Sequence, residues 1–199
     1  MSKINAVCVY CGSSPGTEPA FVEAAQNFGK ILAEDGVRLV YGGGSVGLMG
    51  AVANAVLEHG GAATGVIPEF LMKKEQAARG PEMIVTRDMH ERKRTMFERA
   101  DAFVALPGGV GTLEELVEQL TWVQLGRHKK PVLIANIKGY WDPLLTLLTH
   151  MREQEFLPPP LQVEFLVARR VEDILPKLRE AALHLAEADK AMAVPAERL

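Results

Sequence analysis

The sequence predicts an α/β fold of the Rossmann-like type, in which a parallel sheet is covered by helices on both faces. Two observations lead to this prediction. Apolar runs of strand length alternate with longer amphipathic stretches along the chain, and the short runs are apolar throughout rather than at every second residue. Strands of that composition are buried on both faces, as they are in a parallel sheet between helices.

The first half of the chain shows this alternation. "INAVCVYC" at 4–11 is an apolar run that ends in the turn "GSSPG", so a strand is expected there, with an amphipathic helix following at 21–34. "VRLVY" at 37–41 is the next expected strand, and it leads through a glycine-rich turn into a helix at 47–60. "AATGVIP" at 62–68 is the third expected strand.

The second half repeats the pattern. "EMIVT" at 82–86 is expected as a strand before the helix "MHERKRTMFERA" at 89–100. "DAFVALP" at 101–107 is the next strand; a helix begins after Thr112, and "PVLIANI" at 131–137 is again a strand. The remaining expected elements are a helix from Asp142, a strand at 163–168 and a helix from Val171, with fraying after Glu187.

Composition and charge narrow the class of protein. With 199 residues, 48% of them hydrophobic, and no segment that resembles a linker, residues 1–199 are expected to form one domain. The net charge of -3, with scattered Lys and Arg, does not match a surface that holds nucleic acid. No apolar stretch approaches the roughly 20 residues of a membrane span, and the first residues lack a signal-peptide core. A cytoplasmic protein that binds neither nucleic acid nor membranes is expected.

The cysteines and histidines do not indicate a metal site. Cys8 and Cys11 form a C-x-x-C, but Cys8 lies inside an expected strand and Cys11 runs into a turn, whereas a redox pair of this kind opens a helix. Two thiols also make only half of a zinc site, and the five histidines have no paired-ligand spacing. We interpret the two cysteines as structural.

Glycine-rich turns follow three of the expected strands, after Cys11, Tyr41 and Leu106. In a fold of this type ligands bind outside the carboxyl ends of the strands, where such turns lead into helix N-termini. Glycine lets the backbone approach a ligand closely, and the free amides and positive dipole end of a helix suit an anion, most often a phosphate. These turns therefore indicate a small anionic ligand.

One of these turns fits the dinucleotide pattern G-x-G-x-x-G through Gly42, Gly44 and Gly47. The match follows the second strand rather than the first, and the third strand ends without the acidic residue that would hold an adenosine ribose. Three interpretations remain open at this point: nicotinamide dinucleotide binding, nucleotide monophosphate binding, and close packing of helix on strand.

The helix expected at 89–100 carries two cations near its apolar stripe. Lys93 falls on the stripe at helical spacing, and Arg92 lies one turn before Met96. Lysine and arginine side chains often extend along apolar surface so that their charges reach water. The alternative is that both meet an anion in a cleft, because a buried unpaired charge would cost several kcal/mol.

The run "PGGVGTLEE" also has two interpretations. Thr112 and Glu115 fit a capping box, in which each side chain binds the other residue's amide, while Glu114 favours the helix dipole. A cap does not require "PGG" and Gly111 before it, however. Glycines beside a carboxylate therefore indicate a ligand site as well as a helix start.

Four segments together carry a family resemblance: "PGGVGTLEE" at 107–115, "MHERK" at 89–93, "YGGGSVGLMG" at 41–50 and "VYCGSS" at 9–14. They resemble the LOG (Lonely Guy) family of cytokinin riboside 5'-monophosphate phosphoribohydrolases, many of whose relatives carried the label "lysine decarboxylase-like". The resemblance implies a Rossmann-like fold and hydrolysis of the N-glycosidic bond of AMP or N6-modified AMP. It further implies a homodimer with its site near the interface, and no metal or organic cofactor.

Carried over by motif, Arg92 and Glu115 look like the essential catalytic pair. The residues that the resemblance implies as substrate contacts are Ser13, Gly43, Gly44, Met49, Lys93, Gly108, Gly109, Gly111, Thr112 and Glu114. Glu75 follows "LMKK", as an acidic residue does in plant members, but its spacing to Arg92 is one residue shorter.

The implied chemistry agrees with the residue types. Breaking an N-glycosidic bond passes through an oxocarbenium-like ribose, so a carboxylate near the sugar can stabilise positive charge, hold ribose hydroxyls or activate the attacking water, and Glu115 is expected in this role. The phosphate would lie on the "GGVGT" amides, and Arg92 would hold it or polarise the leaving base. Pyridoxal-phosphate chemistry would need a Schiff-base lysine, whereas Lys93 is better explained by the phosphate. A nucleotide carrier or sensor without turnover and a nicotinamide-dependent oxidoreductase are the rival functions.

Overall fold

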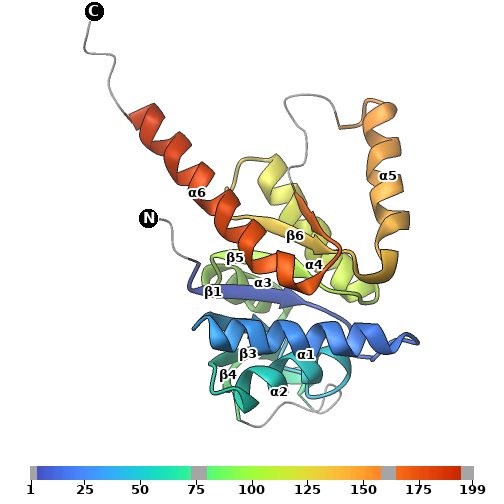
Figure 1. Ribbon diagram of the computed structural model, residues 1–199, viewed down its shortest axis with the longest axis vertical. Helices are drawn as coiled ribbons and strands as arrows, with labels where there is room; N and C mark the ends of the chain where they lie inside the picture. The colour runs from blue at the N-terminus through green and yellow to red at the C-terminus, as the bar shows by residue number, and fades with distance from the viewer. Residues whose placement is uncertain (1–3, 73–79, 158–164, 194–199) are drawn as a thin grey trace, which may run out of the picture.

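The computed structural model describes residues 4–72, 80–157 and 165–193 and contains one sheet of seven parallel strands (Figure 1). The strands are β1 (Ala6–Tyr10), β2 (Arg38–Tyr41), β3 (Ala63–Pro68), β4 (Glu82–Thr86), β5 (Ala102–Ala105), β6 (Val132–Ala135) and β7 (Leu166–Ala168). Their order across the sheet is β4-β3-β2-β1-β5-β6-β7, and every neighbouring pair is parallel. The predicted α/β fold is confirmed.

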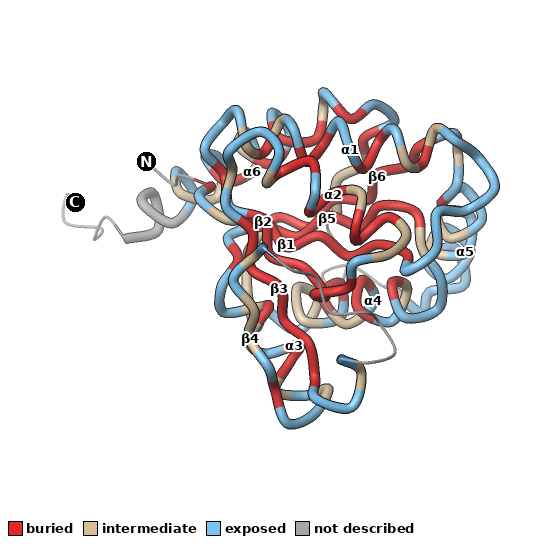
Figure 2. The backbone as a smooth tube through the Cα atoms, turned by 90° about the horizontal axis from the view of Figure 1, so that it is seen from below, coloured by how far each residue is buried: buried red, intermediate tan, exposed pale blue. Residues whose placement is uncertain are grey.

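Six α-helices cover the two faces of the sheet. They are α1 (Pro19–Glu34), α2 (Gly47–Glu58), α3 (Met89–Glu98), α4 (Val110–Gln124), α5 (Asp142–Glu153) and α6 (Ile174–Ala193). Buried side chains of α1, α2 and α6 share one hydrophobic cluster, whereas those of α3 and α4 belong to the other, against which half-buried leucines of α5 pack. Figure 2 shows the buried strands between these two layers.

Side chains of the central strand alternate between the two clusters. Val7 and Val9 of β1 join the cluster under α1 and α2, while Cys8 and Tyr10 join the cluster under α3 and α4. All four are almost completely buried, because both faces of the strand are covered. This double burial explains why the sequence of β1 is apolar at every position.

Two helices differ from their predicted limits. The sequence predicts a helix after Thr112, but α4 begins earlier, at Val110. It also predicts fraying after Glu187, whereas α6 continues as helix to Ala193 after a short 3₁₀ turn at Val171–Asp173. Packing of the first turns of α6 on the sheet supplies the nucleus from which such a helix propagates.

The strand order positions the site. The chain moves outward from β1 to β4 in one direction, then returns to place β5 on the other side of β1. The loops after β1 and β5 therefore lie side by side at the carboxyl edge of the sheet, which is where this kind of fold binds ligands. Of the helices in the described ranges, none combines the length and apolar character needed to cross a membrane.

Candidate active site

A pocket of about 320 Å³ opens at this edge, over the carboxyl ends of β1, β2 and β5. Its walls come from the loop after β1, the loop after β2, one face of α3 and the first turns of α4. The described residues that line it are Val9, Cys11, Gly12, Ser13, Gly42, Met49, Leu71, Met89, Arg92, Gly109, Val110, Gly111, Thr112, Glu114 and Glu115. Three of these, Arg92, Glu114 and Glu115, are charged, and Arg92 and Glu115 are buried.

Arg92 of α3 and Glu115 of α4 form a buried ion pair. Nη1 of Arg92 donates to Oε1 of Glu115 across 2.5 Å, and the two side chains are 9% and 10% exposed. The pair lies on the pocket side of helices that otherwise pack against the sheet. The charge of Arg92 is therefore not extended into water but is neutralised by a carboxylate of the protein.

Burial changes the acidity of this pair. Loss of solvent raises the pKa of Glu115 above the ordinary range of a glutamate, and the Arg92 guanidinium opposes part of that shift. Burial by itself lowers the pKa of Arg92, but the Glu115 carboxylate outweighs it, so Arg92 stays protonated. A carboxylate with a raised pKa is a better proton acceptor than an exposed one, which suits it to general-base chemistry.

The backbone fixes the orientation of the Arg92 guanidinium. Its Nε donates to the carbonyl of Val66 at the end of β3 across 3.1 Å, so the guanidinium bridges this strand and Glu115. A Cβ at Gly42 would lie 2.6 Å from Nη2 of Arg92, so glycine is required where the loop after β2 passes the guanidinium. Arg92 is therefore held by two elements besides its own helix.

Lys93 lies beside the pocket rather than in its lining. Its Nζ forms ion pairs with Glu114 at 2.6 Å and Glu118 at 2.9 Å, which join α3 to α4. The sequence predicts an anionic partner for Lys93, and the partners found here are carboxylates of the protein. Glu118 was not singled out from sequence, although it lies one helical turn after Glu114 and the spacing offered that signal.

The start of α4 corrects the capping-box interpretation. The cap residue is Gly109, which has no side chain, and Thr112 lies inside the first turn, with Gly108 packed against it. Glu115 therefore cannot reach back to a cap at Thr112, and its carboxylate binds Arg92 instead. The sequence pattern was misleading because the helix cap lies at Gly109, three residues before the threonine that the pattern suggests.

The glycines around α4 serve two different purposes. A Cβ at Gly108 would come within 2.8 Å of the Gly12 nitrogen, so Gly108 is needed for close packing of the two loops. Gly109 and Gly111, by contrast, would meet nothing within 4 Å if they carried a Cβ. Their missing side chains leave open space over the helix N-terminus, where backbone amides suit an anion.

The loop after β2 packs tightly and does not offer a free helix terminus. Gly47 has a φ of +61°, and a Cβ there would collide with the backbone of Ser13. The amides of Leu48 and Met49 at the start of α2 both donate to the carbonyl of Gly12, across 3.0 and 3.3 Å. The geometry therefore favours close packing as the role of this glycine pattern over a dinucleotide site.

The structure brings together most of the residues proposed from sequence. Those that line the pocket are Ser13, Met49, Arg92, Gly109, Gly111, Thr112, Glu114 and Glu115. Gly43, Gly44, Lys93 and Gly108 are outside that lining; a Cβ at Gly43 would meet Met83 and Ile67 instead. Gly12 and Gly42 line the pocket but were not proposed, and Glu75 lies outside the described residues.

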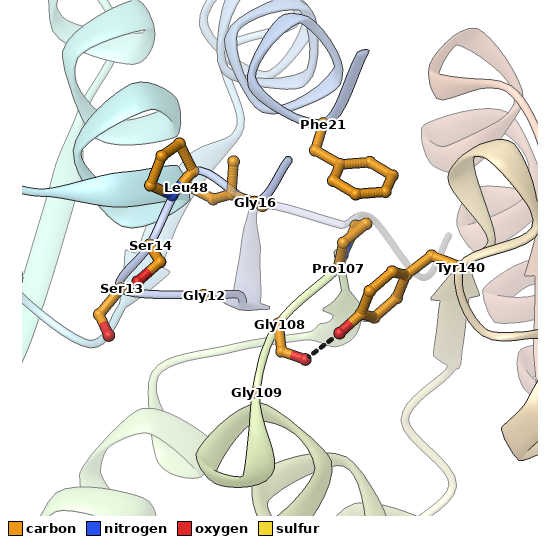
Figure 3. Close-up of a pocket in the computed structure, with 11 residues that line it drawn as sticks. Gly12, Ser13, Ser14, Gly16, Phe21, Leu48, Pro107, Gly108, Gly109 and Tyr140 are labelled. Atoms are coloured by element: carbon orange, nitrogen blue, oxygen red, sulfur yellow. Dashed lines mark hydrogen bonds between the residues drawn. The ribbon is translucent and has the colours of Figure 1, made fainter. Parts of the chain in front are cut away.

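A second, smaller pocket of about 230 Å³ is lined in part by the same glycine loops, and Figure 3 shows its lining residues. Phe21, Leu48 and Tyr140 provide its apolar walls, and it shares Gly12, Ser13 and Gly109 with the first pocket. Tyr140 comes from the connection between β6 and α5 and was not singled out from sequence.

The two cysteines have no disulfide and are buried. Burial raises the pKa of both thiols far above the ordinary value, with a smaller contribution from the negative charge of Glu115. A neutral buried thiol is a weak nucleophile and a poor metal ligand. The structural interpretation of Cys8 and Cys11 agrees with this environment.

Comparison with known proteins identifies the family to which the chain belongs. A profile described as "Possible lysine decarboxylase" matches residues 49–178. The chain is 46% identical over 187 residues to the cytokinin riboside 5'-monophosphate phosphoribohydrolase LOG7 from Arabidopsis thaliana, covering 94% of this chain and 83% of that protein. The chain belongs to the LOG family. The LOG protein of Oryza sativa subsp. japonica is also 46% identical, over 94% of this chain and 74% of its own length.

Solved structures extend the fold comparison beyond the LOG family. The molybdenum cofactor binding protein from Rippkaea orientalis superposes with a TM-score of 0.66 at 20% identity, covering 89% of this chain and 97% of that one. The Moco carrier protein from Chlamydomonas reinhardtii gives the same TM-score at 21% identity, over 92% and 99% of the two chains. At this level of identity the likeness shows a shared fold.

Proposed function

We propose that this chain hydrolyses the N-glycosidic bond of AMP or of N6-modified AMP, releasing the free base and ribose 5-phosphate. The observation that carries this proposal is the buried Glu115, paired with Arg92 beneath the open glycine turn that begins α4. The relatives named cytokinin riboside 5'-monophosphate phosphoribohydrolase support the same reaction, since they align with nearly the whole chain.

The proposed binding mode follows from the two ends of the pocket. The 5'-phosphate lies on the backbone amides of 109–112, where no Cβ at Gly109 or Gly111 obstructs it and the helix dipole favours its charge. The ribose then lies over Glu115, one turn into α4. The base extends toward Met49, Leu71 and Met89, the apolar part of the lining.

The proposed chemistry uses Glu115 as the carboxylate next to the anomeric carbon. A water adds to C1' as the bond from C1' to the base nitrogen breaks, and the bond's electron pair leaves with the base, which takes up a proton from solvent. The Glu115 carboxylate accepts the water's proton and stabilises the positive charge of the oxocarbenium-like ribose. Arg92 holds the carboxylate in place and, because its guanidinium stays protonated, supplies charge rather than a proton.

The lysine decarboxylase description in the family profile is not favoured by this site. Pyridoxal-phosphate chemistry needs a lysine that is free to form a Schiff base. None of the described residues lining the pocket is a lysine, and Lys93 beside it is bound by Glu114 and Glu118. The buried Glu115 and Arg92 in the pocket lining fit a hydrolase that uses acid-base chemistry.

We further propose a homodimer located in the cytoplasm. Val110, Val117 and Leu125 expose apolar side chains along α4, beginning at the mouth of the pocket, and a second subunit would cover them. Two free cysteines in close sequence fit a reducing compartment. Light scattering at micromolar concentration tests the dimer, and a monomer would contradict it.

The first test is to incubate the purified protein with AMP and with N6-isopentenyl-AMP and to separate the products by chromatography. We expect free base and ribose 5-phosphate in equal amounts, with release from a Glu115→Gln control slower by about 10²-fold or more. Binding of both nucleotides without any cleavage would contradict the proposal and favour a nucleotide carrier. A thermal shift with NAD or NADP, but none with AMP, would favour the oxidoreductase.

A further inference from the structure

The hydroxyl of Tyr140 is bound to the glycine loop of the site. Tyr140 Oη donates to the carbonyl oxygen of Gly108 across 2.6 Å, although the two residues are 32 positions apart (Figure 3). No sequence motif marks Tyr140, and Tyr140 takes no part in the proposed hydrolysis. From this contact we infer that Tyr140 is a positioning residue, which orients the backbone amides that bind the substrate's phosphate.

The geometry of the peptide bond supports this inference. In a planar trans peptide the C=O and the following N–H point in opposite directions. When Tyr140 holds the carbonyl of Gly108 on one side, the N–H of Gly109 has to point to the other side. In Figure 3 that side of Gly108, away from Tyr140, is where Gly12 and Ser13 lie, the residues shared with the catalytic pocket.

A second hydrogen bond fixes the preceding peptide in the same manner. The N–H of Gly12, in the loop after β1, donates to the carbonyl of Pro107 across 3.0 Å. Two successive peptide planes of "PGG" are therefore held through their carbonyls, one by the loop after β1 and one by Tyr140. The amide groups of a phosphate site are most effective when they are oriented before the ligand arrives.

Tyr140 is itself held in place by its surroundings. Its ring meets Phe21 of α1 edge to face, with the ring centres 5.4 Å apart. The turn that carries it is fixed by the fully buried Asn136, whose Oδ1 accepts from the amide of Trp141 and whose Nδ2 donates to Asp142. Just before Tyr140, Lys138 adopts a φ of +53°, a conformation that non-glycine residues seldom adopt without such support.

The inference rests on the proposed function, and it is tested by removing the hydroxyl group of Tyr140. Tyr140→Phe removes the hydrogen bond and keeps the ring against Phe21. One neutral hydrogen bond corresponds to a change of about fivefold in affinity. We expect the KM for AMP and the inhibition constant of inorganic phosphate each to rise about fivefold, with kcat within about twofold of wild type. The inhibition constant of adenine, which has no phosphate, should not change.

Tyr140→Leu separates the hydroxyl from the packing of the ring. If Tyr140→Phe keeps wild-type values while Tyr140→Leu loses affinity, the ring alone matters and the inference is overturned. An equal rise in the inhibition constants of adenine and phosphate would also overturn it, because that pattern indicates a general distortion of the site.

The same design distinguishes this inference from the proposed function. Wild-type protein that leaves AMP intact contradicts the proposed function. Calorimetry with inorganic phosphate then decides the role of Tyr140 separately: weaker binding by Tyr140→Phe than by wild type supports it, and equal or undetectable binding by both overturns it.

Discussion

Arg92 and Glu115 come from different helices, yet Nη1 of one and Oε1 of the other are only 2.5 Å apart in a buried pair. Removing one partner from such a pair leaves a charge without compensation, which is usually more costly than replacing both. The same contact therefore determines both the stability of the α3–α4 contact and the protonation of the proposed catalytic carboxylate. Substitutions at these two positions should affect both properties.

Replacing Glu115 by glutamine should remove most of the activity. Glu115→Gln keeps a hydrogen-bond acceptor for Arg92 but loses the carboxylate, so we expect turnover of AMP to fall about 10²- to 10⁴-fold. The free energy of unfolding should fall by about 2 kcal/mol, because Arg92 loses its counter-charge. Steady-state kinetics and thermal unfolding check this. Glu98→Gln, an exposed carboxylate of α3, is the control, and turnover retained by Glu115→Gln would contradict the mechanism.

Replacing Arg92 by lysine should be damaging even though the charge is kept. A single ammonium cannot donate to the carbonyl of Val66 and to Glu115 with the geometry of a guanidinium. We expect kcat/KM for AMP to fall at least about 10-fold for Arg92→Lys. The matched change at the exposed Arg94, two positions along α3, should leave kcat/KM unaltered. Equal behaviour of the two variants would show that Arg92 acts only as a charge.

Two glycines of one loop should respond differently to alanine. Gly108→Ala would force the Thr112 side chain or the Gly12 backbone to move, so we expect a loss of about 1–3 kcal/mol in stability. Gly111→Ala places its methyl in open space inside a helix, so stability should stay equal or rise, by up to about 1 kcal/mol. The methyl enters the pocket, however, so the KM for AMP should rise. Thermal unfolding and kinetics together separate the two roles, and a destabilised Gly111→Ala would disagree with the structure.

His128 should make the protein less stable in mild acid. Burial, together with the nearby charge of Lys130, lowers the pKa of His128 from 6.5 to about 4. Its Nδ1 accepts from the amide of Lys130 across 3.1 Å, a hydrogen bond that protonation of Nδ1 would break. Between pH 4 and pH 6.5 the unfolded chain therefore binds more protons than the folded one, so stability is lost as the pH falls through this window.

The measurement is the thermal midpoint of wild type and His128→Asn between pH 4 and pH 7.5. Asparagine retains an acceptor near the Nδ1 position but does not titrate in this range. We expect the midpoint of the variant to depend less steeply on pH below 6.5. Parallel curves for the two proteins would show that other groups cause the acid sensitivity.

The fold was predictable because its central strands are buried on both faces. The runs around β1 and β5 are apolar at every position, and the glycines that follow them indicate where each strand ends. Arg92 and Glu115 were singled out from sequence, one as a cation near a core-facing stripe and the other as a carboxylate after several glycines, and the structure places them in contact. Each of these signals lies within a few neighbouring residues.

What could not be predicted depends on contacts between distant segments. The Thr112 and Glu115 pattern fits a helix cap locally, and only the packing of Gly108 on Thr112 and the nearby guanidinium of Arg92 decide against it. The partners of Lys93 likewise depend on how α3 lies against α4. Tyr140 reaches the carbonyl of Gly108 only because β6 pairs with β5, and no local sequence pattern predicts that pairing.

The place of β1 in the sheet has a consequence for the order of folding during synthesis. In the finished protein β1 is an interior strand, paired with β2 on one side and β5 on the other. A nascent chain that has emerged only as far as β4 leaves one edge of β1 without a partner, and that edge carries the apolar sequence "AVCVY". Unpaired apolar edges promote aggregation. Residues up to the end of β5 must therefore emerge from the ribosome before both edges of β1 are paired. Only then can the loops after β1 and β5 meet to form the site.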